Sequence, residues 1–262
     1  MDLGIKGKNA LVLASSQGLG LGMATALCDE GANVLICGRS ADKLAAASAK
    51  LNEAGPGAAE HAIVDLFAVD AASTLYAAAH EKLGSIDILI NNSGGPPPGD
   101  IQTPDSDQWR KQFDAMVIRI IEITNLCVAD MKQSDWGRVL TIASSGVVQP
   151  IPNLSMSNTI RSSLLGWNKS LANEVAAAGI TANVLLPGRI HTERVDQIDA
   201  ANAKKAGKTV DEIAAATKAT IPMGRYGTVE EFASVGAFLV SERARYVTGS
   251  VIRCDGGLIR SI

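Results

Sequence analysis

Apolar residues are distributed along this chain in two alternating patterns. Short, nearly continuous apolar runs are separated by longer stretches in which apolar residues return every three or four positions. The short runs indicate strands buried on both faces, and the longer stretches indicate amphipathic helices. Strands that alternate with helices in this way predict a parallel α/β sheet. We expect strands at residues 10–14, 33–37, 61–64, 86–90, 138–143, 180–186 and 250–254, and helices after each of the first two strands and at 70–83, 105–131, 160–178 and 228–240.

The turn after the first strand contains Ser16, Gly18, Leu19 and Gly20 and leads into a helix. In a dinucleotide-binding βαβ unit, glycines at this point let the backbone approach a pyrophosphate, and the helix N-terminus favours negative charge. The same residues also fit a simple tight turn before a packed helix. Because no linker, composition shift or repeat divides the chain, we predict one α/β domain, residues 1–262, with a Rossmann-type doubly wound parallel sheet.

Composition narrows the possible partners. The formal net charge is −3, so the chain lacks the basic excess that binds nucleic acid. No apolar run reaches the roughly 20 residues that a membrane span needs, and the N-terminus lacks the apolar core of a signal peptide. The four cysteines, Cys28, Cys37, Cys127 and Cys254, are scattered through apolar segments, which predicts buried thiols in a cytoplasmic protein. With three histidines and no His/Cys cluster, no metal site is expected.

The end of the second strand bears on the choice of dinucleotide. A carboxylate there would bind the ribose 2′-hydroxyl of NAD(H), whereas an Arg nearby accepts a 2′-phosphate. Here the strand leads into Gly38, Arg39 and Ser40, without an acid. Because a guanidinium pairs bidentately with a phosphate, this sequence favours NADP(H) over NAD(H); the alternative is a solvated loop arginine.

Several segments resemble landmarks of the short-chain dehydrogenase/reductase family, in particular its bacterial 3-oxoacyl-acyl-carrier-protein reductase branch. They are the glycine turn, Asp65-Leu66, Asn91-Asn92-Ser93-Gly94, the segment 187–192, Ile221–Arg225, Val247–Gly249 and Asp255–Gly257. In the glycine turn, Leu13 and Ala14 stand where the family has Thr and Gly. The resemblance covers nearly the whole chain. It implies cofactor contacts from Ser16, Gly18, Leu19, Gly20, Arg39, Ser40, Asp65, Leu66, Asn92, Ser93, Gly94, Arg161, Pro187, Gly188, Ile190 and Thr192.

The catalytic centre departs from the family pattern. The family's chemistry usually rests on Asn, Ser, Tyr and Lys, with the Tyr and the Lys four positions apart on one helical face. We aligned the chain with the family pattern without gaps, both from the preceding strand and from the following helix. In this alignment Ser144 takes the Ser position, whereas Met116 takes that of Asn, Ser157 that of Tyr and Arg161 that of Lys. A serine hydroxyl lacks the acidity of a tyrosine, which titrates near roughly pH 10, and an arginine is a poor proton donor.

Three functions therefore remain open. The first is an NADP(H)-dependent carbonyl reductase or alcohol dehydrogenase, in which Ser144, Ser157 and Arg161 act on a small-molecule carbonyl or alcohol. Water or His191 would then deliver the proton, although His191 also fits an exposed loop residue. The second is a dinucleotide-binding protein with little redox activity. The third is a non-redox lyase or dehalogenase-like reaction on the same scaffold.

Two further expectations concern substrate access and assembly. Residues 193–222 fall where the family carries a mobile substrate lid, and their balanced charges predict solvated helices. Arg161 or Arg189 can clamp a carboxylate-bearing ligand. The family also implies a homotetramer or homodimer. Apolar residues between positions 116 and 123 exceed what one buried stripe needs, which favours an interface on that helix.

Overall fold

The computed structural model covers all 262 residues and places seven parallel strands in one sheet, in the order β3-β2-β1-β4-β5-β6-β7. The chain runs outward from β1 to β3 and then returns to pair β4 with β1. This reversal creates a switch point between β1 and β4, and doubly wound sheets bind ligands at the carboxyl ends of strands at such a point. The strands are β1 (Asn9–Val12), β2 (Asn33–Gly38), β3 (Ala59–Ile63), β4 (Ile88–Asn91), β5 (Gly137–Ile142), β6 (Ile180–Pro187) and β7 (Val251–Cys254).

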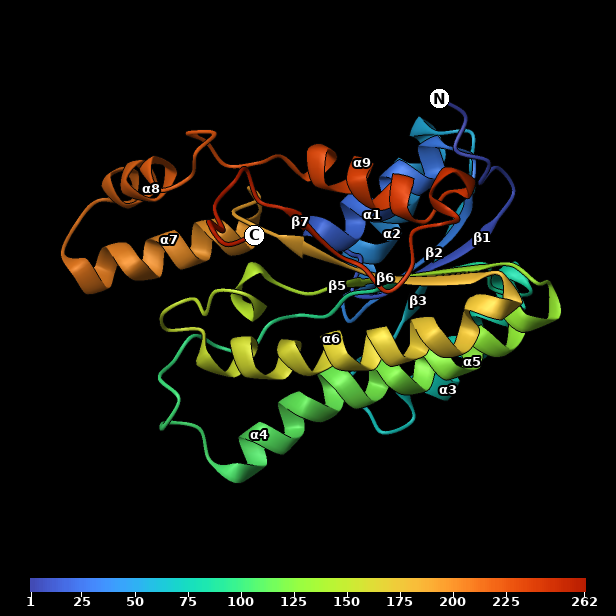
Figure 1. Cartoon of the computed structure of the whole chain (residues 1–262), viewed down its shortest axis with the longest axis horizontal. Coiled ribbons are helices and arrows are strands. Elements are labelled where there is room, and N and C mark those ends of the chain that lie inside the picture. Colours follow the sequence, from blue (N-terminus) through green and yellow to red (C-terminus); the bar gives the residue numbers. More distant parts are fainter.

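Helices cover both faces of the sheet (Figure 1). One face carries α1 (Gly18–Asp29), α2 (Ala41–Ala54) and α9 (Val229–Leu239), and the other carries α3 (Ala71–Leu83), α4 (Ser106–Phe113), α5 (Arg119–Gln133) and α6 (Ser155–Val175). Each layer encloses its own hydrophobic cluster. Successive strand residues alternate between the two clusters, so that Leu11 belongs to one and Val12 to the other.

The remaining helices, α7 (Glu193–Ala206) and α8 (Val210–Ala219), lie beyond the carboxyl edge of the sheet and cover no strand (Figure 1). They begin shortly after β6 ends at Pro187, so the chain leaves the sheet at the edge where the doubly wound fold places ligands. A capping box at Thr209 starts α8, where the Thr209 side chain accepts from the Glu212 amide.

All seven predicted strands are confirmed, with ends shifted by at most two residues. The helix predicted from 160 begins earlier, at Ser155, because its first turn is mostly polar and shows no apolar period. The helix predicted at 105–131 begins with a capping box at Asp105 and ends at Gln133. It is interrupted by a π-helical segment, Asp114–Ile118, which joins α4 to α5. Such segments are frequent at functional sites.

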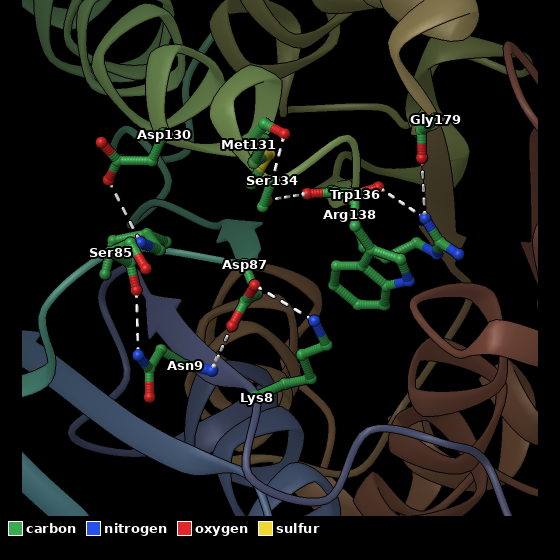
Figure 2. A network of polar contacts seen from close by, with 12 residues as sticks. Lys8, Asn9, Ser85, Asp87, Asp130, Met131, Ser134, Trp136, Arg138 and Gly179 are labelled. Atoms are coloured by element: carbon green, nitrogen blue, oxygen red, sulfur yellow. Dashed lines mark hydrogen bonds and ion pairs between the residues drawn. The ribbon is translucent and has the colours of Figure 1, made fainter.

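A polar network holds the amino ends of the strands together (Figure 2). Arg138 of β5 is 1% exposed and donates to the Gly179 carbonyl. It also pairs with Glu242 at 3.0 Å. Trp136 donates to the same carboxylate, and its ring contacts both the Arg138 guanidinium, at 4.3 Å, and the Lys8 ammonium, at 4.0 Å. These contacts brace the edge of the sheet opposite the switch point.

The predicted burial of the cysteines is confirmed for Cys28, Cys37 and Cys127, whereas Cys254 is partly exposed; all four thiols are free. No helix combines the length and apolar character needed to span a membrane. No three His, Cys, Asp or Glu side chains lie close enough together to hold a metal ion.

Candidate functional site

The turn between β1 and α1 has the backbone that an anion cradle requires. Ala14 and Gly18 both adopt positive φ angles, 46° and 61°. A Cβ on Gly20 would lie 2.6 Å from the Ala14 carbonyl oxygen and 2.8 Å from Nδ2 of Asn92, so no larger residue fits there. No side chain caps α1 at Gln17, which leaves the first backbone N–H groups of the helix available to a ligand.

A cavity of about 370 Å³ opens beside this turn, at the carboxyl ends of β2 and β3. Six of the predicted cofactor residues line it: Ser16, Arg39, Ser40, Asp65, Leu66 and Gly94. Lys43 and Gln17 line it as well, and the Lys43 ammonium donates to the Gln17 side chain at 2.7 Å. The cavity therefore places two cations beside a dinucleotide-type turn.

Lys43 was not among the predicted cofactor residues. The signal for it lies in the register of α2: Ser40 caps the helix by accepting from the Lys43 amide, which puts residue 43 at the third helical position. A side chain at that position turns back toward the helix N-terminus and toward Arg39.

The residues that follow β4 connect the turn to the middle of the sheet. Asn92 donates its side-chain amide to the Ala14 carbonyl at 3.1 Å, which ties β4 to the glycine turn. Asn91 is buried and donates to Thr124 of α5 and Thr141 of β5. The Ser93 hydroxyl is buried without a hydrogen-bond partner in the chain. An unpartnered buried hydroxyl at the switch point fits a site that a ligand completes.

Arg161 lies against the same segment from the other side. It projects from α6, is 7% exposed, and donates to the carbonyls of Ile142 (3.3 Å), Ser93 (3.1 Å) and Gly94 (3.3 Å). No carboxylate pairs with it. Burial, with a smaller contribution from Arg194, lowers the pKa of Arg161 to about 10. The guanidinium therefore remains protonated at neutral pH and presents a buried positive charge where β4 and β5 end.

Ser144 and Ser157 lie on two elements next to this cation, the segment after β5 and helix α6. Ser144 follows β5, and its hydroxyl accepts from the Gly146 amide at 3.1 Å. Ser157 stands one helical turn before Arg161 on α6 and is half-buried. Asn158 keeps the loop after Ser144 in place, since its amide group exchanges two hydrogen bonds with the backbone of Ile151.

A second cavity, of about 710 Å³, reaches outward from Ser144. Its inner end is formed by Pro187 and Gly188, its walls by the loop 149–154 and by one face each of α7 and α8. Arg189 and Lys205 are the titratable side chains that line it. This cavity is roomy enough for a small organic molecule.

The segment formed by α7 and α8 is held against the body by two contacts from the first half of α7. Arg194 donates to the Pro96 carbonyl at 3.1 Å, which joins α7 to the proline-rich loop after β4. Asp199 is 3% exposed and accepts from the Tyr226 hydroxyl at 2.6 Å. Its other carboxylate oxygen has no partner in the chain.

Some predicted residues lie elsewhere. The imidazole of His191 is exposed and pairs with Asp196 at 3.1 Å, and it is not among the residues that line the large cavity. The exposed-loop interpretation of His191 is therefore the one that the geometry favours. Leu19 packs against the hydrophobic core, and Ile190 lines a separate cavity of about 210 Å³. Thr192 lines a cavity of about 460 Å³ together with Gly18, so it does lie beside the glycine turn.

The apolar excess between positions 116 and 123 has an explanation within the single chain. Met116, Val117, Ile120 and Ile123 are all at most 3% exposed and belong to the hydrophobic cluster on that face of the sheet. Only Ile118 and Ile121 are partly exposed. Most of the apolar side chains of this stretch therefore pack inside the chain itself, and an interface on that helix stays a prediction that rests on Ile118 and Ile121.

Nearly the whole chain matches one family of enzymes and is similar to individual members of known function. A family described as Enoyl-(Acyl carrier protein) reductase matches residues 13–259. The chain is 32% identical to a D-beta-hydroxybutyrate dehydrogenase of Cupriavidus necator, with 97% of this chain and 99% of that protein covered. It is also 32% identical to a 3-oxoacyl-(acyl-carrier-protein) reductase of Haemophilus influenzae, with 98% and 100% covered.

The fold agrees with solved structures of similar proteins. The L-sorbose reductase of Gluconobacter frateurii, solved in complex with NADPH and L-sorbose, superposes with a TM-score of 0.95. The two chains are 28% identical, and 100% of each is covered.

Proposed function

The chain belongs to the short-chain dehydrogenase/reductase family of oxidoreductases, and on that premise we propose that it binds NADP(H) and interconverts a small carbonyl compound and its alcohol at an atypical catalytic site. Bound NADP(H) would supply or accept the hydride in this reaction. The observation that carries the proposal is the close-packed cradle of Ala14, Gly20 and Asn92, which opens onto a cavity lined by Arg39 and Lys43.

The cofactor fits the residues present. The free N–H groups of α1 and the positive-φ turn suit a pyrophosphate, as the missing side chain at Gly20 allows the backbone to approach. Arg39, Ser40 and Lys43 would hold the 2′-phosphate, and Asp65 and Leu66 the adenine. The unpartnered Ser93 hydroxyl, Gly94 and Arg161 would hold the nicotinamide half, together with Pro187, Gly188, Ile190 and Thr192.

We further propose that Ser157 and Arg161 occupy the positions at which the family carries Tyr and Lys, and Met116 the position of its Asn. Ser157 and Arg161 are four positions apart on α6, and Met116 falls in the π-helical segment packed against that helix. Arg161 keeps a cation beside the ends of β4 and β5, where it would hold ribose hydroxyls and favour negative charge on a substrate oxygen.

The path of the proton would differ from that of the family. No Tyr, His, Asp or Glu side chain lines the large cavity, so none stands in for the family's tyrosine as a proton donor there. Ser144 can donate its hydroxyl proton in a hydrogen bond to the substrate oxygen and so hold it in place. A water held by Ser144 and Ser157 would then supply the proton that the alkoxide takes up.

The lack of an efficient proton donor also supports a second candidate function, a dinucleotide-binding protein with little redox activity. Such a protein would bind NADP(H) normally but would turn over a substrate slowly. The two functions differ in turnover and agree in cofactor binding.

Fluorescence titration with NADPH and NADH tests cofactor choice. We expect NADPH to bind at least about ten-fold more tightly than NADH, since one charged phosphate contact is worth about 1.5–3 kcal/mol. Arg39→Ala and Lys43→Ala should each weaken NADPH binding and leave NADH binding unchanged. Lys132→Ala, which removes an exposed cation from α5, serves as the control. Equal affinities for both cofactors would contradict the assignment of Arg39.

A panel of ketones and aldehydes with NADPH separates an enzyme from a binding protein. If the atypical centre limits turnover, the double substitution of Ser157→Tyr and Arg161→Lys should raise kcat by about ten-fold or more, because an acid–base group contributes about 10²–10⁴-fold. Ser162→Tyr, at an exposed position on the same helix, is the matched control. Unchanged turnover in a double variant that binds NADPH normally would argue against these positions.

Two proposals concern the rest of the molecule. Residues 193–222, including α7 and α8, would act as the lid of the large cavity, because Val195 and Ile213 line it.

The chain would assemble as a homodimer or homotetramer through the exposed face of α4 to α6, where Phe113 is 38% exposed and Ile118 and Ile121 are partly exposed. Light scattering coupled to size-exclusion chromatography measures the mass; a monomer at micromolar concentration would contradict it.

A further inference from the structure

The large cavity beneath α7 and α8 carries positive charge without any negative charge. Arg189 and Lys205 line it, and no Asp or Glu side chain does. Neither cation takes part in an ion pair of the protein. Because the chain as a whole has a net charge of −3, the cavity differs in sign from the molecule that contains it.

Two acids share a smaller cavity with Arg189, and both are already engaged. Arg189 also borders the smaller cavity of about 210 Å³, which Glu231 and Asp255 line. Glu231 pairs with Arg225 at 2.6 Å, and Asp255 accepts from two backbone N–H groups at 2.9 and 3.0 Å. Asp199, which accepts from Tyr226, lines neither cavity. Arg189 forms no ion pair within the chain, so its guanidinium donors are available to a ligand.

Helix α7 sets the length of the cavity. Its lining residues recur at helical spacing on a single face, and they are Val195, Ile198, Asn202 and Lys205. Ten residues of α-helix span about 15 Å, and the long side chain of Lys205 leans back toward the helix N-terminus. Since α7 runs outward from the sheet (Figure 1), Arg189 lies at the inner end of the cavity and Lys205 toward its outer end.

The walls between these cations are largely apolar. Ile198 of α7 and Ile213 of α8 face Ile151 of the opposing loop across the cavity. An ion pair formed beside apolar walls is less screened than one in water, so a ligand anion gains more from the same cation there.

We propose that this cavity binds a carbonyl compound that also carries a carboxylate, and that Arg189 and Lys205 recognise the carboxylate. The inference rests on the proposed function, which places the reacting carbonyl at Ser144. Arg189 would hold a carboxylate close to the carbonyl, by the bidentate pairing that suits a guanidinium. Lys205 would attract the anion to the cavity and hold the carboxylate of a longer chain.

Matched acids and esters test this directly. Initial rates with NADPH are measured for acetoacetate and levulinate and for their methyl esters, which have the same carbonyl but no charge. We expect a KM for each acid about ten-fold or more below that of its ester, as one charged hydrogen bond is worth about that much. Arg189→Ala should raise the KM for both acids about ten-fold, and Lys205→Ala should raise it more for levulinate than for acetoacetate.

The controls separate charge recognition from a loss of structure. Lys204→Ala removes an identical exposed charge from the neighbouring position of α7, which does not line the cavity, and should change no KM. Arg189→Lys should recover part of the acid preference. A variant that has lost its fold is recognised by loss of NADPH binding, and Arg189→Gln then replaces Arg189→Ala. Equal KM values for acids and esters in the unmodified protein, or equal effects of the variants on both, would overturn the proposal.

Carboxylate binding is also measured without turnover. Calorimetric titration of levulinate and methyl levulinate into the NADPH-loaded protein reports binding even if no carbonyl is reduced. If the protein prefers the acid and Arg189→Ala abolishes this preference, the carboxylate site is supported even when the proposed reaction does not occur. No preference between acid and ester would refute the site whether or not the protein is an enzyme.

Discussion

Arg161 is a buried cation without a buried anion beside it. Three carbonyl oxygens accept from its guanidinium, but none of them carries a full negative charge. Taking an ion out of water costs several kcal/mol unless other groups offset it, and burial accordingly lowers its pKa to about 10. Because the burial of this charge does not stabilise the fold, ligand binding explains the position of Arg161 better than stability does. This is the physical reason for placing the cofactor ribose and the substrate oxygen beside it.

A second residue-scale feature is the positive φ angle of Ala14, which is 46°. An L-residue in the left-handed region costs roughly 1–2 kcal/mol, and glycine avoids this cost. Ala14→Gly should therefore stabilise the protein by about 0.5–1 kcal/mol after the larger entropy of unfolded glycine is subtracted. Thermal unfolding should show a rise of about 2–3 °C. Ala46→Gly, in the exposed middle of α2, is the control and should lower stability by about 1 kcal/mol. A destabilised Ala14→Gly would contradict this explanation.

At the scale of elements, Asp130 joins two helices and a strand. This buried carboxylate of α5 accepts from Tyr76 and His80 of α3, both at 2.8 Å, and from the Ile86 amide before β4 at 3.1 Å. One side chain therefore holds the layer that carries α6 and Arg161 against the sheet.

Burial, together with the hydrogen bond and charge of Asp130, raises the pKa of Tyr76 to about 12. The folded state therefore holds the phenol proton more tightly than the unfolded state, where tyrosine titrates near roughly pH 10. This contribution to stability is complete below about pH 10 and is lost as the pH rises through about 12. We expect melting temperatures measured from pH 8.5 to 11 to fall more steeply for the native protein than for Tyr76→Phe. Parallel profiles for the two proteins would refute the assignment to Tyr76.

The network at the amino edge gives a second prediction at this scale. Glu242 accepts from both Trp136 and the buried Arg138. Glu242→Ala would leave the Arg138 charge without its partner, so we expect a loss of about 1–3 kcal/mol in the free energy of unfolding by urea. Glu174→Ala, at an exposed position of α6 without an ion pair, should change stability by less than about 0.5 kcal/mol. Since the network lies opposite the switch point, NADPH affinity should stay the same in Glu242→Ala.

At the scale of the whole molecule, the proposed cofactor would contact elements that lie far apart in the sequence. The glycine turn, the ends of β2 and β4 and the first turn of α7 meet around the switch point. A ligand that binds only the folded state stabilises it by about 2.7 kcal/mol at one hundred times its Kd. For a chain of this size we therefore expect NADPH to raise the melting temperature by roughly 5–10 °C. NADH at the same concentration should raise it less. A melting temperature that neither nucleotide changes would contradict dinucleotide binding altogether.

The sequence by itself determined the strands, the parallel sheet and the turn. Runs such as Val34–Cys37 are apolar on both faces, which requires a layer of helices on each side, and the hydrophobic effect acts on this pattern wherever the run lies in the chain. Ser40 begins one helix and Gly84 ends another, and such caps can be read from the sequence because capping depends on residues within one turn. Among the site residues, Arg39 also followed from a local rule, since it directly follows β2, whereas Asp65 was inferred from the family resemblance.

Only the tertiary structure decided which groups meet in the site. The acceptors of Arg161 come from β4 and β5, far from α6 in sequence, and they are backbone carbonyls that no residue pattern marks. The outward position of His191, the basic cavity between Arg189 and Lys205 and the Asp199–Tyr226 contact likewise depend on how α7 and α8 fold back over the sheet edge. Periodicity reports which face of an element is buried, whereas charge pairing and cavities depend on which distant elements face one another, and only packing sets that.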